Sequence, residues 1–294
     1  MTKAIFTVKA GSGYDDRPEE FYHFPATYLN QVRRAVGDHI IYYEPRRSDA
    51  SSSGRQSYFA TARVTEIVED RKLEGHYYAL VADYLDFDRP VPFSEGEHYY
   101  ESILKRQDGK TNKGAFGRAV REVPDDQFDL ILKAGFSTEL APFEEKELSA
   151  SGFEEAQLEF VRPIVEMTVS RPFRDVAFKR SVRHAYGNRC AVTGLKLING
   201  GGRPEVQAAH IKPVASNGPD SVRNGLALSG TCHWMFDRGL ISVADDYSIL
   251  VSDKLPEQAR ALLNTSGKLI LPDDQSRYPN PYYLEFHRSC VFKA

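Results

Sequence analysis

Residues 205–240, EVQAAHIKPVASNGPDSVRNGLALSGTCHWMFDRGL, decide how the C-terminal part of this chain folds. The run QAAHI is a short extended segment, and the following KPVASNGPDSVR is a loop because of its Pro, Gly, Asn and Ser content. NGLALS is a turn and a brief apolar run, and CHWMFDR is a helix that ends at Gly239. The stretch therefore predicts a strand, a loop, a second apolar run and a helix.

Four polar residues in this stretch have spacings that are informative about function. Asn224 follows His210 by fourteen positions, and His233 follows Asn224 by nine. His233 and Asp237 are four residues apart, so they share one helical face, as two ligands of one divalent cation would. The pattern predicts that an imidazole base lies opposite a metal-binding helical face.

The segments AAHIKP, RNGLALS and CHWMFDRGL together resemble the HNH motif of the ββα-metal endonucleases. This resemblance implies metal-dependent hydrolysis of DNA phosphodiesters, with magnesium or manganese as the cation. It implies that His210 is the general base, that Asn224 fixes the loop and that His233 binds the metal. Asp237 falls where some members carry a further ligand.

The motif departs from many members of the family at the position before the base. Many members have an Asp or His metal ligand there, and this chain has Ala209. The metal would then rest on His233, Asp237, water and substrate phosphate, or on a residue that the sequence does not identify.

A second departure concerns zinc. Many members carry two Cys-x-x-Cys pairs, of which this sequence keeps Cys190 and Cys232, with Thr193 and Ser229 in the partner positions. Two thiolates do not make a closed tetrahedral site, so no structural zinc is expected.

Length and composition predict a two-domain cytoplasmic protein with no membrane partner. A chain of 294 residues usually divides into two domains. No long apolar run suggests a signal sequence or a membrane span, and three widely separated cysteines do not suggest a disulfide framework. The net charge of −3 means that any contact with nucleic acid must come from local basic patches.

The first half of the sequence reads as a β-rich module. Strands are predicted at 39–45, 57–68 and 76–84, an edge-like segment at 89–93, and a helix at 124–136. Residues 11–28 are dense in turn formers and predict a structured loop rather than a strand. A small curled sheet or barrel is therefore expected.

GDHIIYYEP followed by YFATARVTEI resembles the PUA-like superfamily, which includes the SRA, EVE and ASCH domains. The resemblance implies a nucleic-acid-binding barrel, and some such domains take a flipped modified base into an aromatic pocket. Arg46, Arg47 and Arg55 could meet phosphates. Aromatic residues in strands are alternatively core residues. The candidates for a modified-base pocket are Tyr22, Phe24, Tyr42, Tyr43 and Tyr58.

The expected architecture is α+β, with a PUA-like domain at 1–140, a linker with helical pieces at 141–172 and the HNH domain at 173–294. Between 171 and 189 six basic residues face one acid, on a stretch with helical apolar spacing. This helix is predicted to follow a DNA backbone, although a solvated basic face is the alternative. The DNA-binding candidates are Arg174, Lys179, Arg180 and Arg183. No catalytic role is assigned to His287.

Three classes of function fit this sequence. The first is a modification-dependent restriction endonuclease that reads modified cytosine in double-stranded DNA and acts as a homodimer, because one HNH centre cuts one strand at a time. The second is an HNH nuclease gated by an N-terminal domain that senses RNA or a small ligand. The third is a catalytically degenerate DNA-binding protein, for which Ala209 is the hint.

Overall fold

The computed structural model describes residues 2–8, 16–45, 56–137 and 170–294. The chain divides into two compact units, Met1–Arg174 and Asp175–Ala294, which are treated separately below. The domain boundaries predicted from the sequence, with the second domain beginning at residue 173, stay a prediction. The predicted linker at 141–172 falls almost wholly outside the described residues.

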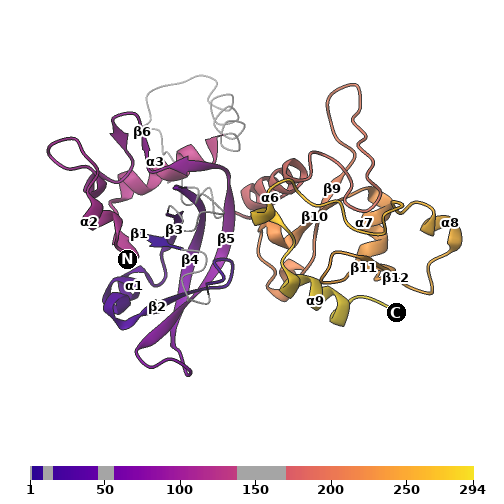
Figure 1. Ribbon diagram of the computed structural model, residues 1–294, viewed down its shortest axis with the longest axis horizontal. Coiled ribbons are helices and arrows are strands. Elements are labelled where there is room, and N and C mark those ends of the chain that lie inside the picture. The colour runs from indigo at the N-terminus through magenta and orange to yellow at the C-terminus, as the bar shows by residue number, and fades with distance from the viewer. Residues whose placement is uncertain (1, 9–15, 46–55, 138–169) are drawn as a thin grey trace, which may run out of the picture. The chain divides into compact units, whose positions relative to one another are not determined.

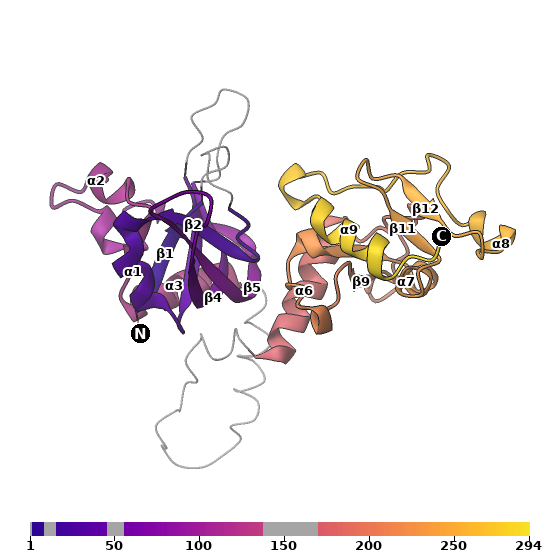
Figure 2. The same ribbon diagram turned by 90° about the horizontal axis from the view of Figure 1, so that it is seen from below.

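The described part of the first unit is built on a six-stranded curled sheet with the order β2-β5-β4-β3-β1-β8 (Figures 1 and 2). Neighbouring strands are antiparallel except for the parallel pair β1 and β3. Its strands are β1 (Ala4–Thr7), β2 (Phe21–Pro25), β3 (His39–Glu44), β4 (Ser57–Glu69), β5 (His76–Pro92) and β8 (Val120–Glu122). A hairpin of β6 (Ser94–Glu95) and β7 (His98–Tyr99) and the helices α1 (Leu29–Ala35), α2 (Lys113–Phe116) and α3 (Asp125–Gly135) accompany it.

The strands predicted at 39–45, 57–68 and 76–84 and the helix predicted at 124–136 are confirmed as β3, β4, β5 and α3. The prediction that residues 11–28 form a loop rather than a strand is wrong for Phe21–Pro25, which pairs with β5 from Leu80 to His76. The many turn formers around this short segment obscured its pattern, in which Tyr22 and Phe24 face the core. A PUA-like identity for this unit stays a prediction.

The proline-containing end of β5 lies at a local edge of the sheet, as the sequence predicts. Although β5 stands between β2 and β4 in the strand order, β2 pairs only with its first five residues. Beyond them β4 is the one strand among the described residues that pairs with β5, with Val91 opposite Tyr58. Proline has no backbone N–H to donate to a neighbouring strand. It is tolerated here because this part of β5 is paired on one side rather than on two.

The second unit contains a ββα arrangement that agrees with the sequence prediction (Figure 1). Strand β9 (Gln207–His210) pairs antiparallel with β10 (Gly225–Leu228), so that His210 lies opposite Gly225. Helix α7 (Gly230–Asp237) follows at once, capped by the Ser229 side chain, which accepts a hydrogen bond from the Cys232 backbone N–H. Gly239, with φ +71°, ends the helix as predicted.

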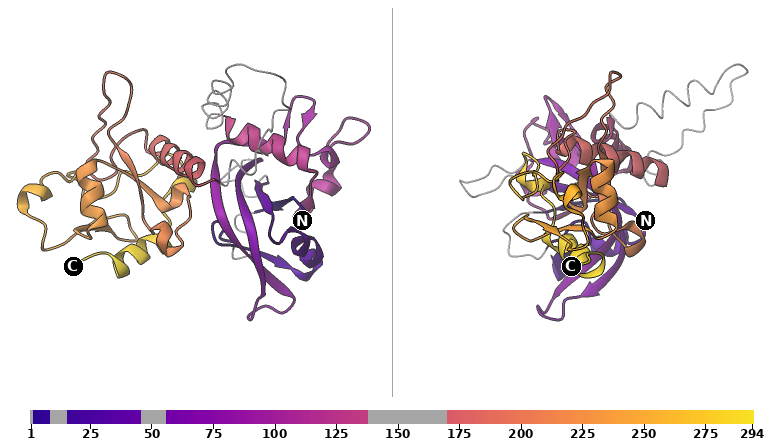
Figure 3. Two further views of the ribbon diagram at one scale, coloured as in Figure 1. Left: turned by 180° about the vertical axis from the view of Figure 1, so that it is seen from behind. Right: turned by 90° about the vertical axis from the view of Figure 1, so that its right-hand side faces the viewer.

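Other elements enclose this ββα centre, as Figure 3 shows from two further directions. They are α6 (Arg171–Ala185), which begins in the last residues of the first unit, and β11 (Ile241–Val243), β12 (Ile249–Val251), α8 (Glu257–Arg260) and α9 (Pro281–Cys290). A Cβ added to Gly225 would lie 2.4 Å from the Val182 side chain, so only glycine lets α6 pack this closely on β10. The predicted hairpin after the motif is confirmed as the antiparallel pair of β11 and β12.

His287 lies in the core of the second unit, where it is 2% exposed. Its ring stacks on Phe236 with centroids 3.7 Å apart, and its Nε2 lies 3.1 Å from the Phe236 carbonyl oxygen. Burial lowers the pKa of His287 to about 4, so this ring is neutral and structural near pH 7. Within the described ranges, no helix has the length and apolar character needed to cross a membrane.

Candidate active site

His210 stands at the end of β9 in contact with two residues that fix its imidazole ring. Its Nε2 lies 2.9 Å from Oδ1 of Asp220, whose side chain is fully buried, whereas the His210 side chain is 21% exposed. The ring also stacks on Phe178 of α6, with centroids 3.8 Å apart and planes 12° apart. Because a carboxylate only accepts, neutral His210 carries its proton on Nε2 and keeps a lone pair on Nδ1. The ring is therefore held as a base with a defined tautomer.

Asn224 closes the loop that joins β9 to β10. Its buried amide donates to the carbonyl oxygens of Lys212 and Pro219, both at 2.9 Å, and its Oδ1 accepts from the Lys212 N–H at 2.9 Å. Gly218 is needed in the same loop, since an added Cβ would lie 1.8 Å from the Lys212 carbonyl oxygen. These bonds hold the loop that carries Asp220, and with it the partner of His210.

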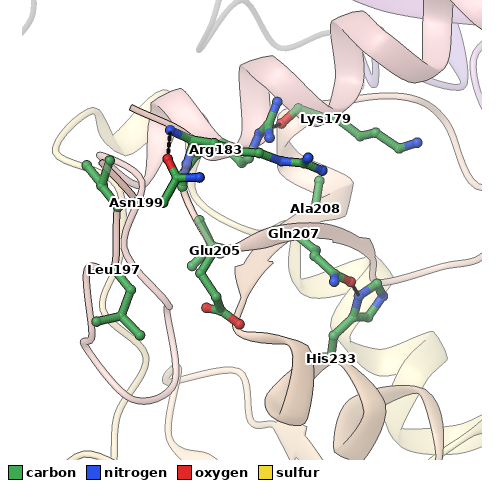
Figure 4. Close-up of a pocket in the computed structure, with 12 residues that line it drawn as sticks. Lys179, Arg183, Leu197, Asn199, Glu205, Gln207, Ala208 and His233 are labelled. Carbon is green, nitrogen blue, oxygen red and sulfur yellow. Dashed lines mark hydrogen bonds between the residues drawn. The ribbon is translucent and has the colours of Figure 1, made fainter. Parts of the chain in front are cut away.

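His233 and Asp237 face each other on α7. Nε2 of His233 lies 3.5 Å from Oδ2 of Asp237, and Nδ1 lies 2.9 Å from Oε1 of Gln207 on β9 (Figure 4). When neutral His233 donates from Nδ1 to this amide oxygen, its Nε2 lone pair faces the Asp237 carboxylate. Two electron-pair donors turned toward one point suit a divalent cation, so these residues fit the metal that the motif implies.

Within the parts of the chain that the structure describes, no third His, Cys, Asp or Glu joins this pair. Ala209 is fully buried in the apolar core, so this position supplies no ligand. The remaining coordination positions would belong to water and substrate phosphate, which is common for magnesium.

Asp220 and Gln207, the two residues that orient the histidines, are not among the site residues predicted from the sequence. Asp220 follows Gly218 and Pro219, in a segment whose composition is typical of a polar turn. Gln207 lies two residues before Ala209, which puts it on the face of β9 where many relatives have a metal ligand. This period-two spacing was the available signal for Gln207.

A groove of about 720 Å³ adjoins His233 (Figure 4). Lys179 and Arg183, two of the four basic residues predicted to bind DNA, line it together with Gln207. Arg180 is exposed but does not line this groove. Arg174 belongs to the first unit, where its guanidinium pairs with Asp83 at 2.6 Å. The groove thus offers cations beside the His233 and Asp237 pair.

The four residues at the places of a zinc site lie together. Thr193 donates its backbone N–H to the Cys190 sulfur at 3.5 Å, and that sulfur lies 3.8 Å from the Ser229 hydroxyl. A hydrogen bond from the Cys232 thiol lowers the pKa of Cys190. Two hydroxyls thus stand where relatives carry thiolates, and the absence of structural zinc stays a prediction.

The five aromatic candidates for a modified-base pocket are all packed inside the first unit. None is more than 3% exposed; they are Tyr22, Phe24, Tyr42, Tyr43 and Tyr58. Tyr42 stacks on Phe59 with centroids 5.9 Å apart, and the Tyr58 hydroxyl donates to the buried Glu101 carboxylate at 2.7 Å. Stacking on a base would require these rings to be uncovered, so that role stays a prediction. Arg46, Arg47 and Arg55 lie outside the described residues.

The ββα centre, with a held imidazole on its first strand and a His and Asp pair on its helix, defines the class of ββα-metal nucleases. Residues 190–244 match the sequence family described as HNH endonuclease, so the second unit contains an HNH endonuclease domain.

Two solved structures are similar to the whole chain. The first is a modification-dependent TagI restriction endonuclease, at 17% identity, with 97% of this chain and 81% of that chain covered and a TM-score of 0.33. The second is the type IV phosphorothioation-dependent restriction endonuclease ScoMcrA, at 15% identity, with 97% and 57% covered and a TM-score of 0.22. No curated protein matches the sequence. Because both TM-scores are below 0.5, neither neighbour indicates the substrate of this chain.

Replacing Asp220 with Asn is expected to lower kcat for DNA cleavage about a hundredfold or more while changing KM little. The amide lacks the charge that stabilises the imidazolium, and it can present an N–H to His210 and reverse the tautomer. Steady-state cleavage by Asp220→Asn, with the exposed Asp253→Asn as control, measures this effect. A kcat within threefold of the unchanged chain, at equal thermal stability, would show that Asp220 does not orient the base.

Proposed function

We propose that this chain is a modification-dependent DNA endonuclease that acts in the cytoplasm. Its HNH domain hydrolyses phosphodiesters in double-stranded DNA, and its first unit recognises a modified cytosine. The observation that carries the nuclease assignment is the hydrogen-bonded pair of His210 and buried Asp220 at the end of β9, within the segment that matches the HNH family.

The chemistry follows from the groups present. Nδ1 of His210 accepts a proton from the attacking water, and Asp220 stabilises the imidazolium that forms. Lys179 and Arg183, on the wall of the groove, hold phosphates next to the scissile one. His233 and Asp237 would hold the divalent cation, magnesium or manganese, which when bound neutralises charge on the phosphate and on the leaving oxygen.

Replacing His210 with Ala is expected to reduce cleavage at least about a hundredfold while DNA binding persists, because only the proton acceptor is lost. His233→Ala should lose activity through the metal, and a chelator should have the same effect on the unchanged chain. The exposed His184 of α6 provides a matched control, and His184→Ala should cleave normally. Cleavage by His210→Ala within tenfold of the unchanged chain, or cleavage that resists chelation, contradicts this mechanism.

The first unit is the candidate for the part of the chain that selects DNA. The HNH chemistry acts on a phosphodiester and is indifferent to base sequence, so a cell that holds this nuclease with its own DNA needs a gate. The second unit contains the nuclease residues, and the first is a separate compact unit with its own aromatic core. A cytosine modification is the mark that we propose it reads.

The catalytically inactive His210→Ala chain should bind duplexes with 5-methylcytosine or 5-hydroxymethylcytosine more tightly than the same duplex with cytosine. One methyl contact or one hydrogen bond contributes about 1 kcal/mol, so the preference should be roughly tenfold for each contact. Titration at fixed salt with the three matched duplexes measures this preference. Equal affinities would remove the modified-cytosine proposal and favour gating by RNA or a small ligand.

The active form is proposed to be a homodimer. One HNH centre has one base and one metal site, so two centres cut both strands in one binding event, and two-fold dimers are the commonest oligomers. Sedimentation of the full chain, free and on DNA, should give the mass of two protomers. A monomer in both states, with double-strand breaks that appear only after nicks accumulate, would contradict the dimer.

The degenerate DNA-binding protein is the remaining alternative. It predicts duplex binding with no cleavage under any divalent cation and any base modification. The orientation of both His210 and His233 by hydrogen bonds favours an active centre.

A further inference from the structure

Between α6 and β9 the chain forms a hairpin at residues 197–205, called here the apolar hairpin. An antiparallel bridge joins Ile198 to Pro204, and the Glu205 N–H donates to the Leu197 carbonyl oxygen at 3.0 Å. At the tip the Asn199 side chain accepts hydrogen bonds from the backbone N–H groups of Gly201 and Arg203, at 3.0 and 2.8 Å. In Figures 1 and 3 this segment extends away from the ββα centre. Hydrogen bonds among its own residues therefore hold the hairpin in this conformation.

Large apolar side chains are exposed at Leu195 and in the apolar hairpin. Leu195, Leu197 and Ile198 are 55%, 53% and 46% exposed, three of four consecutive residues. Leu197 and Ile198 also line the groove that contains His233 (Figure 4). Contiguous exposed apolar residues on a folded protein mark an interaction site, whereas the other large exposed side chains of this unit are scattered along the sequence.

The charges around these apolar side chains select the partner. Arg203 of the hairpin lines the groove together with Lys179 and Arg183, and Lys196 directly precedes the hairpin in the sequence. The acid that lines the groove, Glu205, accepts a hydrogen bond from the Gly230 N–H at 2.8 Å and so caps the start of α7. Apolar side chains framed by cations match the sugars, base edges and phosphates of a nucleic acid duplex.

We propose that the apolar hairpin is a DNA-contacting arm that enters a groove of the duplex beside the scissile phosphate. Leu197 and Ile198 pack against deoxyribose and base edges, and Arg203 meets a phosphate. The major groove, about 12 Å wide, admits a two-stranded β ribbon. The glycines at the tip, Gly200 to Gly202, leave no side chains to obstruct entry. This inference rests on the proposed nuclease function and assigns duplex positioning to a segment that takes no part in the chemistry.

The test separates positioning from chemistry in the full-length chain. A double variant, Leu197→Ser with Ile198→Ser, removes the apolar surface, and Leu262→Ser, which removes a 47% exposed side chain elsewhere, is the control. Each variant is assayed for binding to a duplex in the His210→Ala background. With His210 intact, each is assayed for manganese-supported hydrolysis of bis(p-nitrophenyl) phosphate, a phosphodiester that lacks the duplex which the hairpin is proposed to contact.

The double variant should bind the duplex at least about tenfold more weakly and hydrolyse the small phosphodiester within twofold of the unchanged chain. Arg203→Ala should reduce the slope of log affinity against log salt by about one, as expected for the loss of one phosphate contact. The proposal would be overturned if the double variant and Arg203→Ala both bound the duplex with an affinity within twofold of the unchanged chain. It would also be overturned if Leu262→Ser weakened binding as much as the double variant does. Absence of phosphodiester hydrolysis in the unchanged chain would instead refute the nuclease function, and the binding result would still decide the role of the hairpin.

Discussion

The site depends on one hydrogen bond, between Nε2 of His210 and the buried Asp220 carboxylate. Burying a carboxylate is costly unless polar partners compensate it, so this bond constrains both the strand that carries His210 and the loop that carries Asp220. Asn224 closes that loop with three hydrogen bonds, and Phe178 covers one face of the imidazole. The helix, the strand and the loop therefore all hold the same ring, and its Nδ1 lone pair remains for chemistry.

The His233 ring is also oriented by a hydrogen bond to an oxygen acceptor. There the oxygen acceptor is the amide of Gln207, and the nitrogen left with a lone pair faces Asp237. In the proposed function one histidine accepts a proton and the other binds a cation, and an oxygen acceptor fixes each tautomer. Position 209 carries no ligand for the proposed metal. Gln207, on the same face of β9, instead orients His233, the proposed ligand.

The sequence predicted the framework of the site well and its supporting groups poorly. Glycine and proline punctuation and the spacing of His233 and Asp237 were enough to predict the first strand, the loop and α7, because these signals are local. Asp220 and Gln207 act through contacts across ten and twenty-six residues, and a single sequence does not show such pairings. The aromatic residues of the first unit illustrate the same limit. Regular alternation predicts that Tyr58 shares a strand face with Ala60, but an irregular register pairs Tyr58 with Tyr43 and Ala60 with Tyr42, which puts them on opposite faces, and both are fully buried.

The tautomer of the His210 ring, which the Asp220 carboxylate is proposed to fix, can be measured. Nitrogen-15 chemical shifts of the histidine rings in the full chain, with His210 assigned by comparison with the His210→Ala spectrum, report which nitrogen carries the proton. Neutral His210 is expected to be protonated on Nε2, with the shift of a hydrogen-bonded N–H, and unprotonated on Nδ1. A neutral ring protonated on Nδ1 would contradict it, because the nitrogen assigned to accept the proton from water would then have no lone pair.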